Sequence, residues 1–247
     1  MPFPFLKRNR TVAGFTRSSP FAVDMHAHIL PALDNGPETL EESITLLQEM
    51  SANGVRKIIA TPHIMGEYYR NGEENIRSSL YRIRSELQRR CISLEIDAAA
   101  EYYLDVSLIS LLETNQPLLT IAETYLLLET NIVGTPSLLG EAIKLARQRN
   151  LVIVLAHPER YHYLQQNFNL VIDLHRLGVL FQVNLGSWTS NHQGTRMLAE
   201  RLASEGLISF AGSNVHNLRD WSQAHEALHS RNFAKLLEKG LLNQHLL

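Results

Sequence analysis

The chain of 247 residues has a single cysteine, a formal net charge of only −2 and no long apolar run. One cysteine, Cys91, excludes an internal disulfide framework and is typical of a reducing compartment, so we expect a cytoplasmic protein. The small net charge argues against a nucleic-acid binder that relies on bulk positive charge. No window approaches the ~18 consecutive apolar residues of a membrane-spanning helix, so we expect no membrane span.

The ordinary balance of residues indicates a globular protein. Hydrophobic residues make up 45% of the chain and charged residues 19%, which is enough apolar material for a sizeable core. Residues 1–20 carry several basic side chains but no apolar run behind them, so they are not a secretory signal. We expect them to form a mobile basic arm, and we expect residues 21–247 to form a single domain.

Short aliphatic segments alternate with longer amphipathic ones along the chain. Strands alternating with helices predict a parallel sheet, and about seven such units without a linker favour a closed α/β barrel. The predicted strands are 21–25, 57–60, 94–100, 124–128, 151–156, 179–183 and 207–211. The predicted helices are 38–53, 73–90, 138–149, 164–177, 194–205 and 221–238.

The segment DMHAHILPALDNG, at the end of the first predicted strand, holds two histidines one residue apart. A strand places residues i and i+2 on one face, so His26 and His28 can direct their rings at one point, with Asp34 close behind. One such pair proves little. It needs partners from other strands to make a metal site.

Almost every later strand also ends in a histidine, a carboxylate or an amide. In a barrel these strand ends share one rim, so we expect the side chains to converge there. Imidazole and carboxylate ligands suit zinc, iron or manganese, and about nine donors can hold two or three divalent ions. The positive charge of such a cluster favours an anionic substrate, and phosphate is the obvious one. The later donors are His63, Glu101, Glu129, His157, Asn214 and His216.

The segments DMHAH, TPH, AAAE, AHPERY and SNVHN together resemble the PHP (polymerase and histidinol phosphatase) superfamily. They are most similar to its bacterial capsule- and exopolysaccharide-associated protein-tyrosine phosphatases. The resemblance implies a distorted seven-stranded (β/α) barrel of the TIM type and three neighbouring metals, usually manganese, with iron or zinc also able to bind. It implies three ligand sets, with Glu101 shared by the first two: His26, His28, Glu101 and Asn214; Glu101, Glu129 and His157; Asp34, His63 and His216.

Asn214 departs from the family pattern, in which an aspartate stands at this position of the last motif. An amide oxygen can still coordinate a metal, but it is neutral and a weaker ligand. We therefore expect a weakened first metal site and reduced activity. The asparagine is either native to this chain or an introduced replacement.

The implied activity is hydrolysis of phosphotyrosine on protein by a metal-activated hydroxide. The implied substrate is the tyrosine-rich tail of a bacterial autokinase that controls polysaccharide export. Arg160 is the first candidate for a phosphate clamp and Arg219 the second, because a guanidinium can bind phosphate through two hydrogen bonds. Tyr68 and Tyr69 are candidates for lining the entrance to the site.

Several alternatives stay open, and the oligomeric state is not indicated. One is a phosphatase for a small metabolite such as histidinol phosphate, or a phosphodiesterase, and another is a non-catalytic phosphotyrosine-binding relative. An amidohydrolase is disfavoured, since no predicted strand end carries the lysine that often bridges its metals. A thiol mechanism is also disfavoured: six residues after Cys91 stands Asp97, not the arginine of a phosphate-binding loop, and we expect Cys91 to be buried or half-buried.

Overall fold

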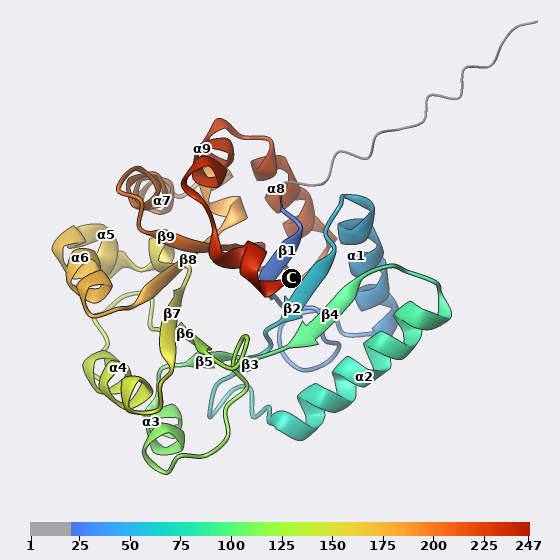
Figure 1. Cartoon of the computed structure of the whole chain (residues 1–247), viewed down its shortest axis with the longest axis horizontal. Helices are drawn as coiled ribbons and strands as arrows, with labels where there is room; N and C mark the ends of the chain where they lie inside the picture. The colour runs from blue at the N-terminus through green and yellow to red at the C-terminus, as the bar shows by residue number, and fades with distance from the viewer. Residues whose placement is uncertain (1–20) are drawn as a thin grey trace, which may run out of the picture.

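The computed structural model describes residues 21–247, and the predicted basic arm of residues 1–20 lies outside them. Strands occupy the middle of the molecule and helices surround them (Figure 1). The strands are β1 Val23–Ala27, β2 Lys57–Ala60, β3 His63–Ile64, β4 Glu95–Ala98, β5 Glu101–Tyr103, β6 Tyr125–Glu129, β7 Val152–Ala156, β8 Leu180–Asn184 and β9 Ile208–Gly212.

Helices follow most strands and pack their apolar faces on the outside of the sheets. The α-helices are α1 Leu40–Ala52, α2 Glu73–Arg89, α3 Val106–Glu113, α4 Leu139–Gln148, α5 His162–Gln166, α6 Phe168–Arg176, α7 Gln193–Ser204, α8 Leu218–Leu228 and α9 Arg231–Lys239. Short 3-10 helices are η1 Pro158–Arg160, η2 Leu185–Thr189 and η3 Leu242–Leu246. In residues 21–247, none of these helices is both long enough and apolar enough to cross a membrane.

The predicted parallel α/β architecture is confirmed, but the prediction of seven continuous strands is not. Every ladder between these strands is parallel, and they form one sheet in the order β1-β2-β4 and another in the order β3-β5-β6-β7-β8-β9. The second predicted strand, 57–60, coincides with β2. After Thr61 and Pro62, where proline has no N–H to donate, the chain forms β3, which was not predicted. The third predicted strand, 94–100, ends at Ala98 as β4, and after the break at Ala99 and Ala100 the chain forms β5, which was not predicted either. Each break moves the chain from one sheet to the other.

The end of β1 is joined to the segment that follows β9. The backbone N–H of His28 donates to Val215 O at 2.9 Å, and the N–H of Asn214 donates to His26 O at 2.8 Å. The buried carboxylate of Asp24 accepts hydrogen bonds from the N–H and the hydroxyl of Ser213. The carboxyl ends of the first and last strands therefore lie side by side.

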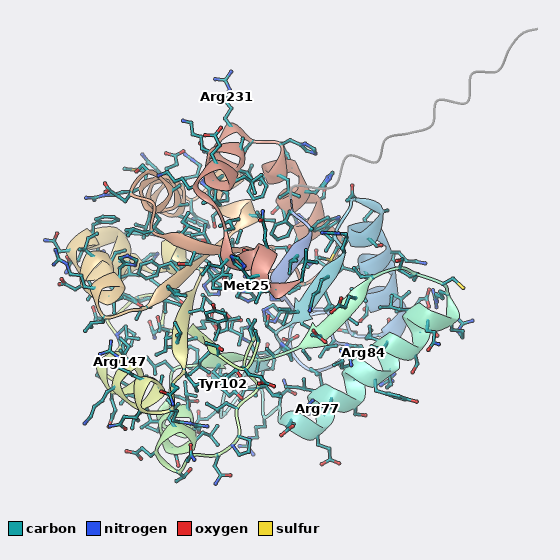
Figure 2. All side chains as sticks on the ribbon, in the orientation of Figure 1. Met25, Arg77, Arg84, Tyr102, Arg147 and Arg231 are labelled. Carbon is teal, nitrogen blue, oxygen red and sulfur yellow. The ribbon has the colours of Figure 1, made fainter. Side chains whose placement is uncertain are left out.

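A bulge in β1 changes which side chains face the interior. Val23 and Asp24 pair with successive residues of β2, but Ala27 pairs with Ala60, so β1 has one extra residue. Met25 lies in the interior cluster and at the centre of the ring of strands (Figure 2), and after the bulge the ring of His26 also turns inward, toward Glu101. Bulges commonly redirect a side chain in this way.

Some helix predictions were wrong in detail. The predicted helix 164–177 is broken at Asn167, and 221–238 is broken at Ser230, whose side chain caps a new helix by accepting from Phe233 N. Helix α3 was not predicted; Asp105 caps it by accepting from Leu108 N. The starts of α9 and α3 depend on capping side chains rather than on apolar periodicity, whereas Asn167 makes no side-chain cap.

The last residues of the chain cover the interior. Leu246 of η3 packs in the same apolar cluster as Met25. The buried amide of Asn243 donates to Val23 O and Ala211 O and accepts from Ala211 N. This segment therefore ties β1 to β9 through backbone contacts.

Candidate metal centre

Glu101, the first residue of β5, lies at the centre of a group of imidazoles. Its carboxylate is fully buried, and its Oε2 lies 3.2 Å from Nε2 of His26, Nε2 of His28 and Nδ1 of His63. Its Oε1 lies 2.9 Å from Nε2 of His157. Four histidines from three segments, the end of β1, β3 and the end of β7, therefore converge on one carboxylate, as the strand-end argument predicted.

Glu129 and His216 complete the group on two sides. Glu129 Oε2 lies 3.6 Å from His63 Nδ1, and Glu129 Oε1 lies 3.8 Å from His157 Nε2. The rings of His28 and His216 are stacked, with centroids 4.2 Å apart. Both Glu129 and His216 keep a small exposed fraction, so the group opens to solvent on their side.

Asp34 also lies at this group of ligands, but it contacts Nδ1 of His28, the ring nitrogen that faces away from Glu101. Its Oδ2 lies 2.6 Å from Nδ1 of His28 and accepts from the backbone N–H of His63, while its Oδ1 accepts from Gly36 N. A carboxylate on Nδ1 directs Nε2 of the ring toward the cluster. Here Asp34 orients a neighbouring ring; its predicted role as a direct ligand stays a prediction.

The donor atoms fit divalent metal ions. Within residues 21–247, three groups have ligand atoms all within 4.8 Å of one another: His28, His63 and His216; His26, His28 and Glu101; His63, Glu101 and Glu129. Buried atoms without a hydrogen-bond partner include Nδ1 of His63, Oε2 of Glu101 and Oδ1 of Asn214. Buried polar atoms are normally satisfied, so these orphaned atoms are what a site built for cations would present.

The carboxylates of this centre have opposite pKa shifts. Burial, together with the negative charge of Glu101, raises the pKa of Glu129 to about 8. Burial acts in the same direction on Glu101, but the charge of His26 and the hydrogen bond from His157 outweigh it and hold the Glu101 pKa well below its usual range. Without cations, one carboxylate therefore carries the charge and its neighbour keeps a proton.

The imidazoles of the centre also have pKa values shifted in opposite directions. Burial opposes the charged form of His28, yet hydrogen bonds to Asp34 and Glu101 raise its pKa to about 10. Burial lowers the pKa of His63 to about 4 and that of His157 to about 3. The two neutral rings have free lone pairs, which is the state that binds a metal.

Two of the strand-end residues have left-handed backbone conformations. The φ angle is 33° at His157 and 52° at Asn214. Such angles are uncommon for residues other than glycine and concentrate at functional sites. They occur where β7 and β9 end, and they bend the chain across the rim of the centre.

Arg160 and Arg219 lie in different pockets. Arg160, Asn214 and His216 line a polar pocket of about 640 Å³. The positive charge of Arg160 lowers the pKa of Glu129 as a minor influence, which places the guanidinium near the centre. Arg219 is exposed and lines a second pocket with His216. Of the two arginines, Arg160 is the better placed.

The predicted entrance residues differ from each other. The ring of Tyr69 stacks on His63, with centroids 5.4 Å apart, whereas Tyr68 is 76% exposed. Cys91 is exposed in the turn after α2, so the expectation that it is buried was wrong. Its left-handed φ of 54° places it in a tight turn rather than in the core.

Sequence reasoning missed the residues that support the candidate ligands. Gln182, fully buried in β8, contacts His26, and Asp220 of α8 accepts from the backbone N–H of His216 at 3.0 Å. Glu159 is also fully buried, beside Arg160. The signal for Gln182 in the sequence was a glutamine between apolar residues in the strand LFQVN.

Comparisons with known proteins identify the family of this chain and similar sequences. A family model described as "Capsular polysaccharide synthesis, CpsB/CapC" matches residues 22–231. The tyrosine-protein phosphatase CpsB of Streptococcus agalactiae serotype V is 27% identical over 203 residues, which is 79% of this chain and 83% of that protein. The tyrosine-protein phosphatase YwqE of Bacillus subtilis is 28% identical over 199 residues, covering 80% of this chain and 78% of the relative.

A solved structure is also similar over most of the chain. It comes from a study of YwqE from Bacillus subtilis and CpsB from Streptococcus pneumoniae, described there as unique metal-dependent tyrosine phosphatases. It has a TM-score of 0.76 and 28% identity, and the match covers 87% of this chain and 91% of that one. The fold is thus similar to that of a metal-dependent tyrosine phosphatase structure.

Proposed function

This chain belongs to the capsular polysaccharide synthesis CpsB/CapC family, and on that basis we propose that it is a metal-dependent tyrosine-protein phosphatase. The observation that carries the proposal is the buried Glu101 carboxylate with four imidazoles within 3.2 Å. Phosphate-ester hydrolysis needs concentrated positive charge around the phosphoryl group, and cations held by this set would provide it.

We propose that the centre holds two or three divalent ions, with Mn²⁺ as the resident metal. The donors are imidazoles and carboxylates without thiolate, a set that suits manganese and also iron or zinc. When bound, such ions polarise a phosphoryl oxygen and lower the pKa of water. The proposed ligands are His26, His28, Asp34, His63, Glu101, Glu129, His157, Asn214 and His216.

The other residues of the site bind and orient the substrate. Arg160 shares a pocket with Asn214 and His216, and we propose that its guanidinium binds phosphate oxygens there by charge-assisted hydrogen bonds. We propose that Tyr69, whose ring stacks on His63, lines the entrance for the substrate ring. The leaving phenolate, with a pKa near ~10, needs no strong general acid.

Asn214 makes this centre less negative than an aspartate would. Its Oδ1 is buried and has no hydrogen-bond partner, so the atom is free to coordinate. A neutral oxygen attracts a cation less than a carboxylate does. We propose that the ion nearest to Asn214 is held more weakly and that turnover is correspondingly reduced.

We further propose the finer features of the protein. Joining β2 with β3 and β4 with β5 as two interrupted strands gives a distorted seven-stranded barrel, and residues 21–247 act as one domain. The proposed substrate is the tyrosine-rich tail of a bacterial autokinase in the cytoplasm. The family description, which names capsular polysaccharide synthesis, and the names of the relatives as tyrosine-protein phosphatases support a phosphotyrosine protein substrate in that process.

The test is metal content and turnover measured on the same sample. We expect bound Mn²⁺, hydrolysis of a phosphotyrosine peptide, loss of hydrolysis with a chelator and little turnover of histidinol phosphate. Glu101→Gln should lose both metal and activity, whereas the exposed control Glu205→Gln should keep both. Faster turnover of histidinol phosphate would favour a metabolite phosphatase, and activity that resists chelators would refute the proposal.

A further inference from the structure

We infer that Gln182 is a positioning residue, which sets the tautomer of His26 and the placement of His157 in the metal centre; this inference rests on the proposed function. Gln182 is 0% exposed and lies in the middle of β8. Strand β8 supplied no candidate ligand in the sequence analysis. Its contribution is the side chain behind the ligands.

The side-chain oxygen of Gln182 serves two residues of the centre at once. Its Oε1 lies 2.8 Å from Nδ1 of His26 and 3.3 Å from the backbone N of His157. The strands β1 and β7 are thereby tied to β8 at the position of the metal ligands. A shift of this one amide would move both.

The identity of the oxygen follows from the backbone. The N–H of His157 can only donate, so the Gln182 atom facing it must be the carbonyl oxygen. The other end of the amide, Nε2, donates to Oδ1 of Asn184 at 3.0 Å. The amide orientation is therefore determined by the His157 N–H, without reference to His26, and the contact with Asn184 is compatible with it.

This orientation in turn determines the tautomer of neutral His26, that is, which ring nitrogen carries the hydrogen. Because Oε1 can only accept, Nδ1 of a neutral His26 must carry the hydrogen, and Nε2 keeps its lone pair. That Nε2 lies 3.2 Å from Glu101 Oε2 and 3.2 Å from Nε2 of His28. The lone pair is thus aimed at the place where a cation would sit, as in the carboxylate–histidine–metal arrangements of other metal sites.

The neighbouring strand is shaped to allow this contact. A Cβ on Gly212 of β9 would lie 2.7 Å from Cβ of His26 and 2.8 Å from Nε2 of Gln182. Atoms cannot approach so closely, so only glycine leaves room for both side chains. A residue that merely filled the core would not need this opening.

The test compares Gln182→Met, which keeps length and removes the acceptor, with Gln182→Glu, which keeps the acceptor. The matched control is Asn243→Leu, since this buried amide bonds the backbone of Val23 and Ala211 and touches no candidate ligand. Three measurements are made on each full-length protein: Mn²⁺ affinity by calorimetry, urea unfolding, and imidazole ¹⁵N shifts of His26 in the metal-free state.

We expect Gln182→Met to bind Mn²⁺ on the order of 10- to 100-fold more weakly, the usual effect of losing a hydrogen bond behind a ligand. Its His26 ring should become a mixture of the two tautomers. Gln182→Glu should keep the Nδ1–H tautomer and bind within a few-fold of wild type, because the amide of Asn184 can turn its Nδ2 toward the new carboxylate. Asn243→Leu should lose stability but keep its Mn²⁺ affinity.

Three results would overturn the inference. Wild-type affinity and an unchanged tautomer in Gln182→Met would show that Gln182 only fills space. Equal weakening in Asn243→Leu would show that affinity follows global stability. Failure of the wild type itself to bind Mn²⁺ would refute the metal centre, and this inference with it, so the two failures are distinguished by the wild-type titration alone.

Discussion

The buried carboxylate of Glu159 gives a prediction whose size follows from the structure. Its Oε1 accepts from Asn184 N at 2.9 Å and from Ser187 Oγ at 2.6 Å, whereas its Oε2 has no partner. Burial raises the pKa of Glu159 from 4.5 to about 7, because these hydrogen bonds only partly offset the loss of water. Between pH 4.5 and 7, Glu159 therefore keeps a proton in the folded protein that it has released in the unfolded chain.

The sign and size of the effect on stability follow from this difference. Between pH 4.5 and 7 the folded state binds more protons than the unfolded state, so the free energy of unfolding falls as pH rises through that window. At about 1.4 kcal/mol for each unit of pKa difference, the loss is about 3 kcal/mol. Above pH 7 this group adds no further loss.

The assay is urea unfolding of wild type and Glu159→Gln at several pH values from 4.5 to 8, both loaded with Mn²⁺. We expect the difference between the two free energies of unfolding to change by about 3 kcal/mol in favour of the glutamine as pH rises. The exposed control Glu205→Gln should show no such trend.

A difference between wild type and Glu159→Gln that stays constant within about 1 kcal/mol across this range would refute the reasoning. It would mean that the carboxylate ionises at its ordinary pH in spite of being buried. The unpaired Oε2 would then have to be solvated in the folded protein.

Three further predictions concern the site. Asn214→Asp should raise turnover of a phosphotyrosine peptide on the order of 10- to 100-fold with little change in peptide binding; unchanged turnover would mean that the amide does not limit activity. Arg160→Met should lower kcat/KM about 10- to 100-fold, because a charged hydrogen bond to the substrate is lost. Arg219→Met should lower kcat/KM less. A larger loss in Arg219→Met than in Arg160→Met would make Arg219 the phosphate-binding arginine. Cys91→Ser should leave kcat unchanged, and a large loss would revive a thiol mechanism.

The arrangement of the fold was largely predictable because its signals are local. Apolar runs of four to seven residues and amphipathic segments identified the parallel α/β class, and the predicted strand 151–156 differs from β7 by one residue. The additional strands β3 and β5, and the breaks that precede them, were not predicted. They depend on where Pro62 and Ala100 fall relative to neighbouring strands, which periodicity does not report.

The location of the site was predictable for a similar reason. Parallel strands of a barrel point their carboxyl ends at one rim, so donors that follow strands must meet. His26, His28 and His157 do meet: each has a ring nitrogen within 3.2 Å of the Glu101 carboxylate. The sequence did not predict which of these residues bind which ion, because each candidate ligand lies close to several other candidate ligands.

The sequence by itself determined which residue types stand at the strand ends, and hence that a cation-binding rim was available. The tertiary structure decided how those residues are held. The bulge in β1 turns His26 inward, Gln182 from a strand 156 residues away sets its tautomer, and Asp34 orients His28. Strand alternation acts between neighbours in the chain, whereas the side chain behind a ligand is chosen by register and packing between strands, which exist only in the folded protein.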